Sequence, residues 1–172
     1  PRFDMRKFSK KNVKLGTSMK SVGEAMSIGR TFKEAFQKGV RSLELGRFGF
    51  GFDRKDLTSV SETDLKFALK TPTPDRLFTI KYALEKGMSI EKIYQLSGVD
   101  PWFLHQFNQI IEMAKTIDIS KKENMYRYKR AGFSDYQLAT LTNEKDEMKI
   151  REKRKALGIL PTYSLVDTCA AE

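Results

Sequence analysis

Helix start and stop signals alternate through the second half of the chain, and they constrain its fold more than any other feature. Asp100-Pro101 and Thr73-Pro74 each place a capping side chain before a proline at the first helical position. Glycines suited to ending a helix stand at 87, 98, 132 and 158. Residues 73–158 are therefore predicted to be all helix, with short connections.

Three further start signals have the form of a capping box, in which a hydroxyl and a later Glu or Gln cap the helix reciprocally. They begin at Thr31, Ser120 and Ser134. Apolar residues recur at helical spacing behind these signals. The expected helices are 31–45, 62–70, 73–87, 89–98, 100–117, 120–132, 134–141 and 144–157.

The chain outside these helices reads differently. Residues 19–29 contain two glycines and partial alternation, which indicates a strand or an extended loop. The three closely spaced glycines of 46–52 favour a loop, and we expect a domain boundary near residue 45. The stretch after Gly158 is expected to be extended.

An internal repeat relates the two parts of the helical region. Gly87-Met88-Ser89 and Gly132-Phe133-Ser134 open similar stretches 45 residues apart. Each unit is helix, turn, short helix, turn and longer helix, which is the outline of a helix-turn-helix. The predicted fold class is mainly α, with two small helix-turn-helix-like units.

A helix-turn-helix raises the alternative of a DNA-binding module. The net charge of +10 over 172 residues is compatible with it. However, the helix from Asp100 would offer only Gln106, Asn108 and Gln109 for groove contacts, and no basic residue comes before Lys115. Two helical units packed on each other, with a solvated basic surface, are the preferred interpretation.

Residues suited to catalysis or metal binding are scarce. The chain has a single histidine, His105, and a single cysteine, Cys169, which excludes a multi-cysteine zinc site and disfavours a His-based triad. The glycine-rich stretch 46–51 lacks the spacing of a phosphate-binding loop. We therefore expect no catalytic, cofactor-binding or metal residues, and no membrane span, because no apolar run approaches about 20 residues.

Two groups of residues remain as candidates for function. Glu24 lies between glycines and methionines, where it is either a paired core acid or the lining of a cavity. Trp102, Phe103 and Phe107 are core residues by default, and any that remain exposed would indicate a protein interface. The start at Pro1 suggests a fragment of a longer protein.

Five motifs, in order along the chain, resemble one family. They are MKSVGE from Met19, TPDRLF from Thr73, DPWFLHQ from Asp100, GFSDYQLA from Gly132 and VDTCAAE from Val166. Together they resemble the carbamoyl-phosphate synthetase large chain, at the end of its first ATP-grasp unit and in the helical domain that follows.

The resemblance implies a division of the chain. Residues 1–45 would be the tail of the first ATP-grasp unit, an α/β domain. Residues 46–172 would be the helical oligomerization domain and the start of the linker to the second half. By the same resemblance Met19, Val22 and Glu24 line the wall of a carbamate tunnel, and Trp102, Phe103 and Phe107 are candidates for a subunit interface.

The resemblance also implies a function for the full-length protein. That enzyme makes carbamoyl phosphate from bicarbonate, glutamine-derived ammonia and ATP, with Mg²⁺ or Mn²⁺, for arginine and pyrimidine biosynthesis. Its expected partners are further copies of itself, a glutaminase small chain and the rest of the large chain, but no nucleic acid and no membrane. The expected location is the cytoplasm, and this segment is expected to be the non-catalytic joining and assembly region.

Overall fold

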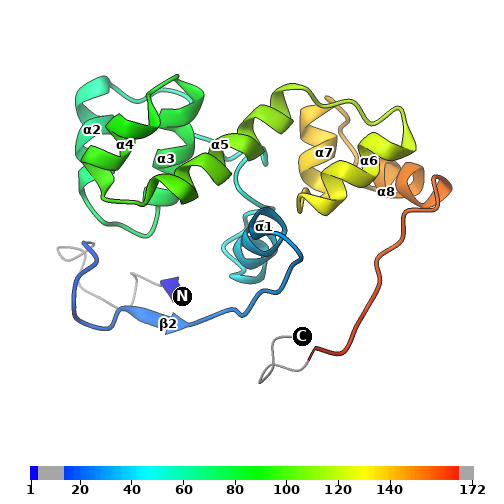
Figure 1. Ribbon diagram of the computed structural model, residues 1–172, viewed down its shortest axis with the longest axis horizontal. Coiled ribbons are helices and arrows are strands. Elements are labelled where there is room, and N and C mark those ends of the chain that lie inside the picture. The colour runs from blue at the N-terminus through cyan, green and yellow to red at the C-terminus, as the bar shows by residue number, and fades with distance from the viewer. Residues whose placement is uncertain (4–13, 167–172) are drawn as a thin grey trace.

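The computed structural model describes residues 1–3 and 14–166, and these are mainly helical (Figure 1). The elements are β1 (Arg2–Phe3), β2 (Ser21–Gly23), α1 (Phe32–Ser42), α2 (Glu62–Lys70), α3 (Arg76–Glu85), α4 (Ile90–Ser97), α5 (Pro101–Lys115), α6 (Lys122–Arg130), α7 (Asp135–Leu141) and α8 (Glu147–Ala156). The predicted fold class is therefore confirmed.

The helices form two groups that α5 connects. Helices α2, α3 and α4 pack against one another, and α3 and α4 also pack against α5, while α7 packs against α8 beside α6. Helix α5 runs from the first group toward the second, and α1 packs against it below (Figure 1). A single cluster of buried apolar side chains extends through both groups, so the two predicted units share one core.

Several predicted helix starts are confirmed at the level of the cap. Ser89 and Asp100 accept hydrogen bonds from the backbone N–H groups of Lys92 and Trp102. Ser134 forms a complete capping box with Gln137. These side chains satisfy N–H groups that the first turn of a helix leaves without partners.

The predicted capping box at Ser120 is wrong. Helix α6 has Lys121 at its N-cap and no side-chain cap; the backbone N–H of Ser120 donates to the Asp118 carboxylate at 2.9 Å, and the Ser120 hydroxyl binds the same carboxylate. Ser120 is thus drawn into a local turn with Asp118. A short polar side chain such as that of Asp118 can form local hydrogen bonds that compete with the capping of the following helix.

The predicted start of α3, with Thr73 as the cap, is also wrong: the N-cap is Asp75, two residues later. The Arg76 N–H donates to the Thr73 carbonyl at 3.2 Å, which closes a turn with Pro74 at its second position. Proline is favoured at that position of a β-turn as well as at the first position of a helix. Helix α8 likewise begins later than expected, at Glu147 after the Asp146 cap.

The glycine-rich stretch 46–52 is a loop, as predicted, and two buried amides fasten it to the helices on either side. The Gln137 side chain donates from Nε2 to Gln37 Oε1 at 3.0 Å and to the Gly51 carbonyl at 2.8 Å. Gln37 Oε1 also accepts from the Phe50 N–H, and its Nε2 donates to the Ala131 carbonyl. Helix α1, the loop and the start of α7 are therefore tied together, while the domain boundary near residue 45 stays a prediction.

The extended segments also follow the expectation. β2 lies within the predicted stretch 19–29 and pairs antiparallel with β1, with Arg2 opposite Gly23 and Phe3 opposite Ser21. Residues 159–166 form neither helix nor strand. The two-stranded pairing is short, and most of residues 14–30 run along the outside of the helical body (Figure 1).

Candidate association surface

Three aromatic side chains, Phe32, Trp102 and Phe103, come together where the first turns of α1 and α5 meet; we call them the aromatic surface. Phe32 lies 5.2 Å from Trp102 and 5.4 Å from Phe103 between ring centroids. Trp102 and Phe103 contact each other edge to face at 5.0 Å. Distances of this size are typical of favourable aromatic pairs.

Two helix caps position the aromatic surface. Thr31 accepts from the Glu34 N–H at 3.2 Å, and Asp100 accepts from the Trp102 N–H at 2.8 Å. Because each cap lies one or two residues before the first aromatic residue of its helix, the caps determine where the first turn of each helix presents its rings. Lys33 joins the two helices further along, donating to the side-chain oxygens of Gln106 at 3.0 Å and Gln109 at 2.7 Å.

Exposure separates the three residues that were predicted for an interface. Trp102 is 52% exposed and Phe103 is 41% exposed, whereas Phe107 is only 5% exposed. Phe107 is therefore a core residue, and its assignment to an interface is wrong for this chain. The reason is that its ring packs against Phe36 and Phe50, at 4.8 Å and 4.9 Å, on the inward face of α5.

Phe32 is the residue of this surface that the sequence did not single out as a candidate for function. It is half-buried and makes aromatic contacts on several sides. The sequence does place Phe32 directly after the Thr31 cap. A side chain in the first turn of a helix lies at the edge of the surface that the helix can bury, so this position could have indicated partial exposure. The proximity of α1 to α5 is not readable from the sequence.

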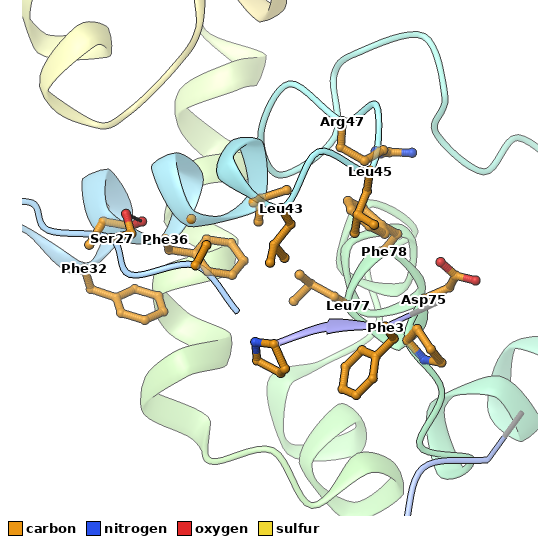
Figure 2. A pocket seen from close by; sticks show the side chains of 16 residues that line it. Phe3, Ser27, Phe32, Phe36, Leu43, Leu45, Arg47, Asp75, Leu77 and Phe78 are labelled. Atoms are coloured by element: carbon orange, nitrogen blue, oxygen red, sulfur yellow. Dashed lines mark hydrogen bonds between the residues drawn. The ribbon is translucent and has the colours of Figure 1, made fainter. Parts of the chain in front are cut away.

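An apolar groove of about 750 Å³ adjoins the aromatic surface. Figure 2 shows its side chains, which come from β1, α1, the start of α3 and the segments just before and after α1. Phe32 and Phe36 belong to the groove as well as to the aromatic contacts, so the two features are continuous. Its apolar walls also include Phe3, Val40, Leu43, Leu45, Leu77 and Phe78.

Two charged side chains, Arg47 and Asp75, stand on the groove wall, and Arg47 is already paired with other groups. The Arg47 guanidinium lies 3.9 Å from the centroid of the Phe78 ring. It is also 3.0 Å from the Asp53 carboxylate and 3.1 Å from that of Asp56. Lys81, buried behind, binds Asp56 at 3.0 Å. The charges of Arg47 and Lys81 are thus balanced by those of Asp53 and Asp56. Apart from Asp75 the groove wall is mainly apolar, so the groove is suited to an apolar surface rather than to an ion.

The residues predicted for a carbamate tunnel lie apart from this groove. Met19 is 82% exposed, and Val22 and Glu24 are also exposed. The alternative of a buried core acid at Glu24 is therefore wrong for this chain. Ala25 and Ser27, just beyond, line the groove instead. The tunnel role of the three residues stays a prediction.

The features considered for DNA binding are used within the fold. Gln106 and Gln109, which would read bases, accept hydrogen bonds from Lys33. The N-terminus of α8 is occupied by the Asp146 cap and by Glu147. His105 is exposed on α5, and Cys169 lies outside the described residues.

Neither a metal-binding cluster nor a membrane-spanning helix is found among residues 1–3 and 14–166. Within them no three His, Cys, Asp or Glu side chains gather as a metal site would require. None of the described helices combines the length and apolarity needed to cross a bilayer.

Comparison with known proteins agrees with the geometry. Residues 24–158 match the family model described as carbamoyl-phosphate synthetase large chain, oligomerisation domain. The whole chain aligns with the carbamoyl phosphate synthase large chain of Nostoc sp. at 47% identity over 177 residues, which covers 16% of that protein. It aligns with the arginine-specific, chloroplastic large chain of Arabidopsis thaliana at 45% identity, covering 15% of it.

A third relative is the N-terminal section of the large chain from Methanopyrus kandleri, 44% identical over 190 residues and covered to 33%. The chain thus spans a third or less of the length of these relatives. None of these matches supports a DNA-binding module. With its helical core and matching full-length relatives, the chain belongs to the oligomerisation-domain family of the carbamoyl phosphate synthase large chain.

Proposed function

We propose that this chain associates with a second copy of itself through the aromatic surface and the adjoining groove. The observation that carries the proposal is the exposure of Trp102 and Phe103 directly beside a groove with apolar walls. Aromatic residues are enriched where proteins associate, and tryptophan is prominent among the residues that contribute most to binding. A closed two-fold dimer is the commonest arrangement for such self-association.

Sedimentation equilibrium of the chain tests this proposal. We expect a concentration-dependent dimer, and Trp102→Lys should raise its dissociation constant at least tenfold, because a charge would replace a ring that the dimer buries. His105→Lys is the matched control, since it adds the same charge at an exposed position on α5 and should change the constant less than twofold. A strict monomer at high micromolar concentration, or equal effects of the two substitutions, would contradict the proposal.

A second variant separates the surface from the core. Phe107→Ala should lower the free energy of unfolding by about 3–5 kcal/mol, as truncation of a buried phenylalanine does. Trp102→Lys should leave most of that free energy intact. Urea unfolding of both variants measures the difference.

For the full-length protein we propose the activity that the resemblance implies: ATP-dependent synthesis of carbamoyl phosphate from bicarbonate and glutamine-derived ammonia. The names of the aligned relatives support it, and the arginine-specific relative supports a link to arginine biosynthesis. ATP and Mg²⁺ or Mn²⁺ would bind in other parts of that protein, and a glutaminase chain would be its partner. The role in pyrimidine biosynthesis and the cytoplasmic location are proposals of the same kind.

Glu24 provides a test within that full-length protein. If it lines a carbamate tunnel, Glu24→Ala should uncouple glutamine use from carbamoyl phosphate formation and leave bicarbonate-dependent ATP hydrolysis largely intact. Lys92→Ala, at an exposed position on α4, is the control. Equal loss of both reactions would indicate a structural role for Glu24.

A further inference from the structure

A second hollow, on the opposite side of α1 from the groove, collects positive charge, and we propose that it binds a phosphate group. It has a volume of about 590 Å³ and lies between α1, α6, α8 and the extended residues 159–163. Its cationic side chains are Arg30, Lys38, Arg41, Lys129, Arg130 and Arg154. We call it the cationic hollow.

Two carboxylates compensate part of this charge. Arg154 binds Asp135 with two nitrogens, Nε at 3.1 Å and Nη2 at 2.9 Å from its oxygens, and Lys129 binds the same carboxylate at 2.8 Å. Lys38 pairs with Glu34 at 2.9 Å. Three cations are therefore held by two acids.

The other three cations have no such partner among residues 1–3 and 14–166. No carboxylate of that part of the chain lies within 4.0 Å of the Arg30, Arg41 or Arg130 guanidinium. Arg41 donates to the Gly132 carbonyl at 2.7 Å, and Arg130 donates to the Tyr126 hydroxyl at 3.3 Å. These neutral acceptors orient two guanidinium groups without cancelling their charge.

Burial makes the concentration of charge costly. Burial lowers the pKa of Arg41, and the charge of the nearby Asp135 carboxylate only partly offsets that decrease. Burial also lowers the pKa of Lys129, with added repulsion from Arg154 and Arg41, although Asp135 acts in the opposite direction. A bound anion would relieve the repulsion between these groups.

The types of cation favour phosphate over other anions. Four of the six are arginines, whose planar guanidinium presents paired N–H donors that match phosphate oxygens. A concave, partly desolvated site also focuses its field on a ligand inside it. The ligand class is therefore a phosphate dianion, either free or as the phosphate group of a small molecule.

Isothermal titration of the chain with inorganic phosphate and with AMP, at matched ionic strength, tests the proposal. The chain encloses its own core, so the titration needs no further domain. We expect saturable one-to-one binding of at least one ligand. Tighter binding of inorganic phosphate would indicate a free phosphate, and tighter binding of AMP would indicate a phosphorylated small molecule.

Arg30 and Arg130 are both exposed, so replacing either guanidinium by an amide in Arg30→Gln and Arg130→Gln should leave the fold intact. Combined, the two substitutions should weaken phosphate binding at least tenfold. Arg151→Gln, an exposed cation on α8 outside the cationic hollow, is the control and should bind as the unaltered chain does. Absence of saturable binding by either ligand, an equal loss in the control, or equal binding of citrate would overturn the proposal.

Discussion

At the scale of single residues, buried polar side chains connect parts of the chain that lie far apart in sequence. Gln37 and Gln137 are both fully buried, and their mutual hydrogen bond spans 100 residues. Each also binds backbone groups of its surroundings, including the Gly51 carbonyl. A buried polar group that loses its partner keeps its desolvation cost, so this pair is expected to be sensitive to substitution.

Gln137→Ala should lower the free energy of unfolding by about 1–3 kcal/mol, because it leaves Gln37 and the Gly51 carbonyl each without one of their partners. Gln95→Ala, at an exposed position on α4, is the control and should change it by less than about 0.5 kcal/mol. Urea denaturation followed by circular dichroism measures both. Similar values for the two variants would contradict the structural role of the amide pair.

Asp135 should make stability depend on pH. Burial tends to raise the pKa of this carboxyl, but the hydrogen bonds from Arg154 and the charge of Lys129 outweigh burial and hold it below its ordinary value. A lowered pKa in the folded state adds stability that is present above the unfolded pKa of about 3.9 and is lost as the pH falls through the folded value. The free energy of unfolding should therefore decrease on acidification in that range.

The comparison with Asp135→Asn isolates this contribution. The variant should be less stable at neutral pH but should lose less stability between neutral and acidic pH, as measured by urea unfolding across the range. Asp75→Asn is the control, since Asp75 is exposed and makes no side-chain capping bond. An unchanged pH dependence in Asp135→Asn would show that the ion pairs with Arg154 and Lys129 do not stabilise the fold.

At the scale of elements, the local surroundings decide which start signals become caps. Ser134 and Ser120 both head a capping-box pattern, yet only Ser134 caps its helix. Ser134→Ala should therefore lower the free energy of unfolding by about 1 kcal/mol.

Ser120→Ala serves as its matched control and should have a smaller effect, within about 0.5 kcal/mol. Thermal unfolding of the two variants side by side gives the comparison. A larger loss for Ser120→Ala than for Ser134→Ala would mean that α6 is capped as its pattern predicted.

At the scale of the whole molecule, net charge should oppose association. The chain carries +10, so two copies repel each other, and salt screens that repulsion. Raising the salt concentration from about 0.01 M to about 0.1 M shortens the Debye length from about 30 Å to about 10 Å. The dimer dissociation constant should fall over this range in sedimentation equilibrium, whereas a rise would indicate ion pairs across the interface.

The sequence by itself determined the helical fold class and most of the helix ends. Caps such as Asp100 and stops such as Gly98 act through hydrogen bonds and backbone angles within a few residues, so a local pattern is enough to predict them. The five family motifs also needed no structure. The pattern was misleading at Ser120 and Thr73, where another local turn competes for the same residue type.

Only the tertiary structure decided which apolar side chains stay at the surface. Trp102, Phe103 and Phe107 share one helix and look alike in a helical pattern, but the position of α1 covers Phe107 and leaves the other two half-exposed. The cationic hollow has the same origin, since Arg30 and Arg154 line one hollow only because α1 lies near α6 and α8. Contacts between residues this far apart depend on how helices pack, which short-range patterns do not encode.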